Sequence, residues 1–189
     1  MNYGIPIDND FLRTLPEYKG KTDLQISSND RSKVAVQQKD VYVSEATKRL
    51  DELKSDYGNG VSTLCRFYNA SGDTIKVNFD HSWRGSFYKD APSSTVANGQ
   101  WTTFVHVHPS GSAKGSCGAV IYRTAADSDI FIGWQNPWNT SYDPTCLVES
   151  QAKDHWWNVG SESYMLYLLD DKSGNRSDYN SYGYKASCL

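Results

Sequence analysis

The sequence predicts a mainly β protein, an antiparallel β-sandwich with an N-terminal amphipathic helix packed on one sheet. Aromatic residues make up 13% of the chain, and flat side chains pack well on pleated strands. Short alternating runs recur at intervals of about 8–15 residues and are bounded by turn residues, as in sandwiches and barrels. At 189 residues we expect one compact unit. It would comprise an N-terminal arm and helix (1–57) and a β-sandwich domain (58–189).

The N-terminal part is expected to supply an arm and a helix. Pro6, Pro16 and Gly20 interrupt residues 1–29, which predicts an extended arm that docks by apolar anchors. Residues 40–57 carry apolar side chains three and four positions apart, at Val43, Ala46, Leu50, Leu53 and Tyr57. This spacing predicts an amphipathic helix that ends at Gly58. Five apolar positions suffice for one docked face, so we expect it to lie on its own β domain rather than on a partner or a membrane.

The strands are expected to begin with a hairpin. Two alternating runs, 61–68 and 75–81, flank the turn-rich residues 69–73 and predict one β-hairpin. Asn98-Gly99 suits a type I′ hairpin turn, because both residues tolerate positive φ. Segment 164–169 is apolar on both faces, which predicts a strand covered on both sides, and 170–181 is expected to be a surface loop. The further predicted strands are 100–108, 118–123, 130–134, 145–149 and 182–187.

Charge and cysteine content narrow the classes of partner and compartment. The net charge of -3 lacks the basic excess that nucleic-acid binding requires. The sequence shows neither an export signal nor a run of about 20 apolar residues, so we expect a cytoplasmic protein without a transmembrane segment. Four widely spaced cysteines with no CxxC pair are expected to be reduced thiols rather than disulfides or zinc ligands: Cys65, Cys117, Cys146 and Cys188.

Several segments carry a family resemblance. GNGVSTLC at 58–65 and NPWNTSY at 136–142 resemble the plant 23 kDa jasmonate-induced proteins, over about residues 40–170. That resemblance implies a stress-induced or defence-associated protein. A fainter similarity, carried by Ser82-Trp83-Arg84-Gly85 and the Asn-Pro-Trp-Asn loop, runs to aegerolysins and implies an aegerolysin/actinoporin-like sandwich that recognises membrane lipids. Asn139 departs from the aegerolysin pattern, which has Gly there, and the first 55 residues have no counterpart.

Clustered aromatic side chains form the candidate binding site. Trp134, Trp138, Tyr142, Trp156 and Trp157 lie within 24 residues that prolines and Gly160 break into turns. Trp134 follows Ile132 at strand spacing and is expected inside. The candidate ligand-binding residues are Trp83, Arg84, Trp138, Tyr142, Trp156 and Trp157. Amphipathic rings in adjacent loops suit a lipid head group or the face of a glycan, and Arg84 would offer a cation to a phosphate. The alternatives are structural packing for the rings and a solvated role for Arg84.

Two histidines form the candidate metal site. His106 and His108 stand two apart on a predicted strand, so their side chains point the same way and with a third ligand could hold a divalent metal. The following residues 109–115 supply no carboxylate, and we expect two half-buried strand histidines with no metal and no other cofactor. The sequence also lacks a GxSxG elbow and a GxxxxGK[ST] phosphate loop.

Three functions from different classes compete. The first is a non-enzymatic binding protein of stress or defence that recognises a lipid head group or glycan through its aromatic loops. The second is a metal-dependent or small-molecule enzyme centred on His106 and His108, which bound metal would favour. The third is a structural or storage protein that forms homo-oligomers through its exposed aromatic side chains, which a concentration-dependent mass would favour.

Overall fold

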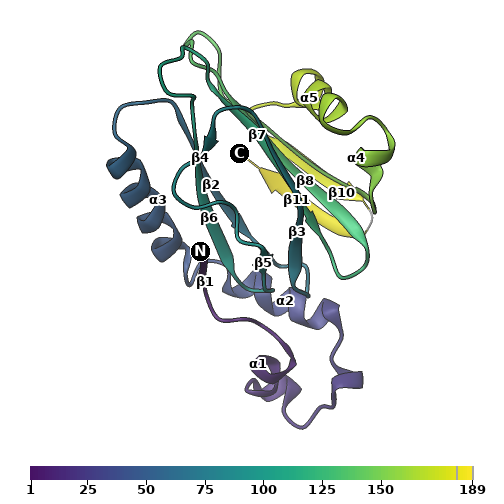
Figure 1. Cartoon of the computed structure of the whole chain (residues 1–189). Coiled ribbons are helices and arrows are strands. Elements are labelled where there is room, and N and C mark those ends of the chain that lie inside the picture. The colour runs from purple at the N-terminus through teal and green to yellow at the C-terminus, as the bar shows by residue number, and fades with distance from the viewer. Residues whose placement is uncertain (182, 189) are drawn as a thin grey trace.

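The computed structural model describes residues 1–181 and 183–188, and two facing antiparallel sheets confirm the predicted β-sandwich (Figure 1). In sheet A, β6 pairs on one side with β2 and on the other with β1 and β4. Sheet B has the order β5-β3-β7-β8-β9. The strands of sheet A are β1 (Asn2–Tyr3), β2 (Ser62–Tyr68), β4 (Ser86–Phe87) and β6 (Trp101–Val107). Those of sheet B are β3 (Ile75–Arg84), β5 (Thr95–Val96), β7 (Ser116–Arg123), β8 (Ser128–Asn136) and β9 (Thr145–Ala152).

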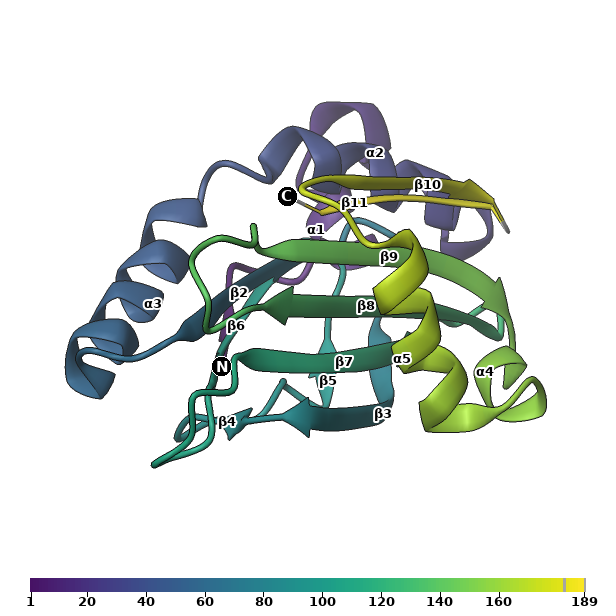
Figure 2. The same cartoon turned by 90° about the horizontal axis from the view of Figure 1, so that it is seen from above.

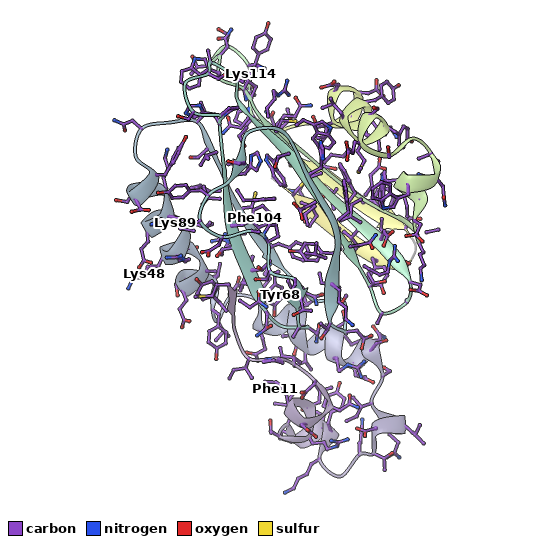
Figure 3. The ribbon with its side chains drawn as sticks, viewed as in Figure 1. Phe11, Lys48, Tyr68, Lys89, Phe104 and Lys114 are labelled. Atoms are coloured by element: carbon purple, nitrogen blue, oxygen red, sulfur yellow. The ribbon has the colours of Figure 1, made fainter. Side chains whose placement is uncertain are left out.

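The main core lies between the two sheets. Phe104 of β6 points into this space (Figure 3) and meets Trp134 of β8, with ring centroids 5.5 Å apart. Val120 and Tyr122 of β7 complete the contact from sheet B. Trp134 is buried, as its strand spacing predicts.

The predicted amphipathic helix is α3 (Val43–Tyr57), and it ends at Gly58, whose φ of +80° suits glycine. Its buried Leu50 and Leu53 pack on Val105 and Val107 of β6. These valines alternate along β6 with the inward-facing Phe104 and His106. Sheet A is therefore covered by α3 on its outer face (Figure 1), and the predicted docking of this helix is confirmed.

The N-terminal residues form a small helical unit, so the prediction of an extended arm is wrong. The unit contains α1 (Asn9–Arg13), two 3-10 turns (Pro16–Tyr18 and Asp23–Gln25) and α2 (Ser28–Gln38). The apolar side chains share a core of their own, formed by Ile7, Leu12, Ile26, Val34 and Ala35. Helix α2 buries only two residues, too few for a periodic stripe, and a capping box of Ser27 with Asp30 starts it.

The predicted hairpin of 61–68 with 75–81 is wrong, because β2 and β3 belong to different sheets. Strand β2 pairs with β6, and β3 pairs with β7. The connection between them crosses from one sheet to the other and is held by Asn69. The buried amide of Asn69 donates to the carbonyl oxygens of Asp73 and Val96, at 2.8 Å each. The turn at 69–73, between two runs of alternating apolar and polar residues, is therefore a corner between the two sheets.

Asn98-Gly99 forms a second corner rather than a type I′ hairpin. It links β5 of sheet B to β6 of sheet A, and of its two residues Gly99 has positive φ, +87°. The amide of Gln100 donates to the carbonyl of Ala97 at 3.1 Å. The Asn98 side chain accepts from the amide of Gly72 at 2.9 Å, so the two corners are tied together.

The two corners also anchor α2 across the end of the sandwich (Figure 1). Arg31 of α2 donates to the carbonyl oxygen of Gly72 at 2.6 Å and pairs with the carboxylate of Asp73. The backbones approach closely here, since a Cβ on Gly72 would lie 2.1 Å from the carbonyl oxygen of Ser28. Glycine at position 72 is therefore required for this docking.

The predicted strand 164–169 is wrong, because it belongs to α5 (Ser161–Lys172). Met165, Leu168 and Leu169 have helical spacing and pack on the outer face of sheet B. Before it comes the short helix α4 (His155–Asn158). The segment 170–181 is not a loop: it contains the end of α5 and strand β10 (Ser177–Ser181).

A C-terminal hairpin lies beside β9. Strand β10 pairs with β11 (Tyr184–Cys188) as a separate two-stranded sheet (Figure 2). The predicted strand 182–187 is thus confirmed over 184–187, and Tyr182 lies outside the described residues. The hairpin is joined to β9 through Ser177, whose hydroxyl accepts from the amide of Val148 at 3.1 Å, and the segment before it is joined through Gly174, whose carbonyl accepts from the amide of Cys146 at 2.8 Å.

Among the helices of the described ranges, none combines the length and apolarity needed to cross a bilayer. The four cysteines are free thiols. Burial raises the pKa of Cys65, Cys117 and Cys188, so these thiols are protonated at neutral pH.

Candidate functional site

A depression of about 550 Å³ lies at one end of sheet B. It brings together three of the predicted binding residues and adds others from β8, from α5 and from the loop between β6 and β7. Figure 3 shows Lys114 at this end of the molecule, opposite the N-terminal unit that contains Phe11. We call this depression the Trp138 pocket. Its lining includes Arg84, Lys114, Gln135, Trp138, Tyr142 and Asp170.

The floor of the Trp138 pocket is one row of residues across four strands. Arg84 of β3 stands opposite Cys117 of β7, Cys117 opposite Gln135 of β8, and Gln135 opposite Thr145 of β9. Side chains in one such row point to the same face of a sheet. Here that face is the one covered by α5, and the hydroxyl of Thr145 contacts that of Ser173 at 2.7 Å. The sheet register therefore assembles the site from residues far apart in sequence.

A chain of polar contacts runs along this floor. The Arg84 guanidinium (Nη2) donates to Oε1 of Gln135 at 3.2 Å, and Nε2 of Gln135 donates to Oδ1 of Asp170 at 2.8 Å. To reach Gln135, Arg84 passes over Cys117 on the intervening strand. Burial raises the pKa of the Cys117 thiol and outweighs the opposing effect of Arg84. The floor thus presents a cation, an amide and a carboxylate over a neutral thiol.

The loop that follows β8 forms one wall and carries Trp138. The base of this loop is fixed, because the Asn136 side chain donates to the carbonyl of Ser62 at 2.9 Å. Gly115 packs against it so closely that a Cβ there would lie 2.0 Å from the carbonyl oxygen of Asn136. Trp138 rests edge-on against His108, with ring centroids 4.9 Å apart. It remains 43% exposed.

Asn139 shapes the tip of this loop. Its side-chain oxygen accepts from the amide of Ser141 at 3.0 Å, and its carbonyl accepts from the amide of Tyr142 at 3.1 Å. An Asx-type turn of this kind uses the side-chain oxygen of asparagine or aspartate, which glycine lacks. Tyr142 is left 67% exposed. Trp138 and Tyr142 therefore project beside a polar floor.

Trp156 was a candidate ligand-binding residue with structural packing as the alternative, and it lies in the core, as the alternative has it. It is 1% exposed and packs on Phe131, with ring centroids 5.5 Å apart. The reason is that residues 155–158 form α4 rather than a loop. That helix turns Trp156 onto the outer face of sheet B, where α5 covers it.

Trp83 and Trp157 are not in the Trp138 pocket either. Trp157 is 47% exposed and contacts Phe79, with centroids 4.9 Å apart. It follows the far end of β9, roughly 23 Å along the strand from Thr145 at about 3.3 Å per residue. Trp83 is half-buried against the α5 side of sheet B, beside His81. The six candidate residues therefore divide between the pocket, the core and a separate aromatic surface.

The two candidate metal-binding histidines have different surroundings. His106 is fully buried, not half-buried as predicted, and its ring nitrogens contact the hydroxyls of Ser116 at 2.8 Å and Ser82 at 2.9 Å. Burial lowers the pKa of His106 to about 4, so it is neutral at pH 7. His108 instead packs against Tyr57 and Trp138. Over residues 1–181 and 183–188, no group of three or more potential metal ligands occurs.

Sequence reasoning missed Lys114, Gln135 and Asp170. The spacing of Met165, Leu168 and Leu169 carries a helical signal that would have placed Asp170 near a helix end. Gln135 directly precedes the Asn-Pro-Trp-Asn loop, but its role depends on the sheet register, which a single sequence does not give.

Comparisons relate the whole chain to known proteins. The family model described as Nakanori-like protein matches residues 3–188. The 23 kDa jasmonate-induced protein of Hordeum vulgare is 34% identical over 186 residues, which cover 96% of this chain and 87% of the barley protein. This confirms the resemblance carried by GNGVSTLC and NPWNTSY and extends it to both ends of the chain. A crystal structure of the lipid binding protein Nakanori matches with a TM-score of 0.93 and 46% identity, covering 99% of this chain and 92% of that one.

Proposed function

This chain belongs to the Nakanori-like protein family, and from that membership we propose that it is a non-enzymatic binding protein that recognises a phospholipid head group in the Trp138 pocket. Nakanori is described as a lipid binding protein and shares the fold over 99% of this chain. The observation that carries the proposal is that two exposed aromatic rings stand beside a floor with charges of both signs. The name of the barley relative supports a stress or defence setting.

The charges of the pocket suit a head group that carries both a phosphate and an ammonium. Arg84 and Lys114 would bind the phosphate, since guanidinium and ammonium groups donate charge-assisted hydrogen bonds to its oxygens. Asp143 and Asp170 also line the pocket. Their carboxylates and the faces of the aromatic rings would both attract the ammonium. Two cations and two carboxylates cancel in formal charge. A zwitterionic head group therefore fits this lining better than an anionic one.

The exposed rings fit the interface of a bilayer. Trp138 and Tyr142 lie on the loop between β8 and β9, and Lys114 lies on the loop between β6 and β7 that lines the same pocket. Tryptophan and tyrosine favour the head-group region, where an apolar ring meets lipid and its polar atom meets water. The fixed base of the loop at Asn136 keeps Trp138 in place, so little order has to be gained on binding.

Two tryptophan variants test the proposal, because Trp138 and Trp157 are similarly exposed at opposite ends of β9. Binding is measured by flotation with phosphatidylcholine vesicles and, separately, with phosphatidylglycerol vesicles. Trp138→Ala should weaken binding to phosphatidylcholine by about 1–3 kcal/mol, or roughly 5- to 150-fold. Trp157→Ala, the matched control, should bind as the parent does.

Thermal unfolding of both variants controls for loss of structure, and Trp138→Ala should melt close to the parent because its ring is partly exposed. The assignment to this pocket fails if Trp157→Ala loses as much binding as Trp138→Ala. If the parent binds neither type of vesicle, the lipid proposal is wrong. Binding on a glycan array would then make a sugar the ligand.

A further inference from the structure

Gln135 lies between the two opposite charges of the pocket floor. Its side-chain oxygen accepts from the Arg84 guanidinium at 3.2 Å, and its nitrogen donates to the Asp170 carboxylate at 2.8 Å. The amide thus makes a polar contact at each end in a single orientation, and a flipped amide would face both partners with the wrong group. The cation and the carboxylate are held one amide group apart.

This separation matters because Arg84 and Asp170 would otherwise attract each other. Arg84 reaches over Cys117 from β3, and Asp170 approaches the same row from α5. Without the amide, two oppositely charged side chains facing one hollow would form a direct ion pair. Two-point pairing of a guanidinium with a carboxylate occupies two N–H groups and both carboxylate oxygens, and each group neutralises the charge of the other. The floor would then hold the same residues but offer less charge to a head group.

We propose that Gln135 is a positioning residue that keeps the Arg84 guanidinium and the Asp170 carboxylate apart, so that each can bind one charge of a zwitterionic head group. The inference rests on the proposed function for its ligand. The separation of the two charges by Gln135, however, is a property of the unliganded protein and is tested without lipid.

The variant Gln135→Met keeps the length of the side chain and removes its polar ends. It should lower binding to phosphatidylcholine vesicles about three- to tenfold, the scale of a lost polar contact. The matched control is Gln151→Met on β9, where the amide contacts Tyr179 at 3.3 Å, away from the pocket. That variant should bind as the parent does.

The double variant Gln135→Met with Asp170→Asn shows whether the loss of binding in Gln135→Met comes from capture of Arg84 by Asp170 or from a general change in structure. In the double variant Arg84 has no Asp170 carboxylate to pair with, so binding to phosphatidylglycerol vesicles should rise above that of Gln135→Met. Binding to phosphatidylcholine should not recover, because the carboxylate proposed to bind the ammonium is also gone. Asp170→Asn alone serves as the reference. Parent-like binding of phosphatidylcholine by Gln135→Met, or no gain for the double variant on phosphatidylglycerol, would overturn the proposal.

Crystal structures of the parent and of Gln135→Met, both without lipid, give the readout that needs no vesicle. In Gln135→Met the Arg84 guanidinium and the Asp170 carboxylate should form a direct ion pair, with N and O within about 4 Å, whereas the Gln135 amide lies between them in the parent. Side chains that stay apart in the variant overturn the role of Gln135, whatever the vesicles show. If the parent binds no vesicle but the ion pair forms in the variant, the lipid proposal fails and the positioning role stands.

Discussion

Lowering the pH should destabilise the protein through one buried histidine, His106. The ring is fully buried, and around it lie the hydroxyls of Ser82 and Ser116 and the aromatic rings of Phe87 and Trp134. Burial lowers its pKa from the ordinary 6.5 to about 4. Between these pH values the unfolded chain binds a proton that the folded protein does not. The stability conferred by neutral His106 is therefore complete above about pH 6.5 and is lost as the pH falls to about 4.

The size of this loss follows from the difference between the two pKa values. Each pKa unit corresponds to about 1.36 kcal/mol, so the folded protein should lose about 3 kcal/mol between pH 7 and pH 4. Carboxylates contribute in a lower range. Hydrogen bonds from Ser27, for example, lower the pKa of Asp30 below 3.8, and that stabilisation is lost only as the pH falls further.

Urea unfolding followed by tryptophan fluorescence, at several pH values from 7 to 4, measures this effect. The control is His106→Gln, which keeps an uncharged polar side chain and does not titrate. Subtracting the variant from the parent at each pH cancels the contributions of other groups. The parent's advantage in unfolding free energy should shrink by about 3 kcal/mol toward pH 4. A difference that stays constant over this range would refute the reasoning.

Two further predictions concern packing. Leu50→Asp places a carboxylate in the contact between α3 and Val105, so it should cost several kcal/mol and unfold the protein or release the helix; unchanged thermal unfolding and far-ultraviolet dichroism would contradict this. Trp156→Ala should cost about 3–5 kcal/mol of stability, measured by urea unfolding, and leave vesicle binding by the folded protein unchanged, because Trp156 lies in the core outside the Trp138 pocket. Weakened vesicle binding by this variant at full stability would show that the ring belongs to the site.

The sequence predicted an element correctly where the apolar side chains of that element repeat with a helical or alternating spacing. Residues 43–57 repeat apolar side chains every three or four positions, and α3 follows that pattern to Gly58. The predicted strands 100–108 and 145–149 likewise correspond to β6 and β9. Of the residues that line the candidate Trp138 pocket, Trp138, Tyr142 and Arg84 were predicted because an aromatic loop and an isolated cation after a predicted strand are local signals.

The predictions were wrong where strand pairing or the length of an element decides the structure. The six apolar residues 164–169 fit a buried strand or a helix equally well, and the helical choice depends on polar residues from Ser161 onward that extend the element to twelve residues. The turn after β2 has the composition of a hairpin, but the buried Asn69 amide ties it to a second corner at Val96. Gln135 joins the site only through the register with Cys117 and Thr145. Contacts of this kind involve residues far apart in the chain, and local periodicity carries no information about them.

The pairing of β1 with β6 bears on how the protein folds during synthesis. Asn2 pairs with Thr102, and Tyr3 pairs with Trp101, so the first strand is translated about 100 residues before its partner. At about 5–20 residues per second, that interval lasts roughly 5–20 s. During this interval, the nascent N-terminal unit can form its small core around Leu12 and Val34, while β1 remains unpaired. A two-residue strand exposes very few unpaired backbone groups in that time, which limits its tendency to pair with another nascent chain.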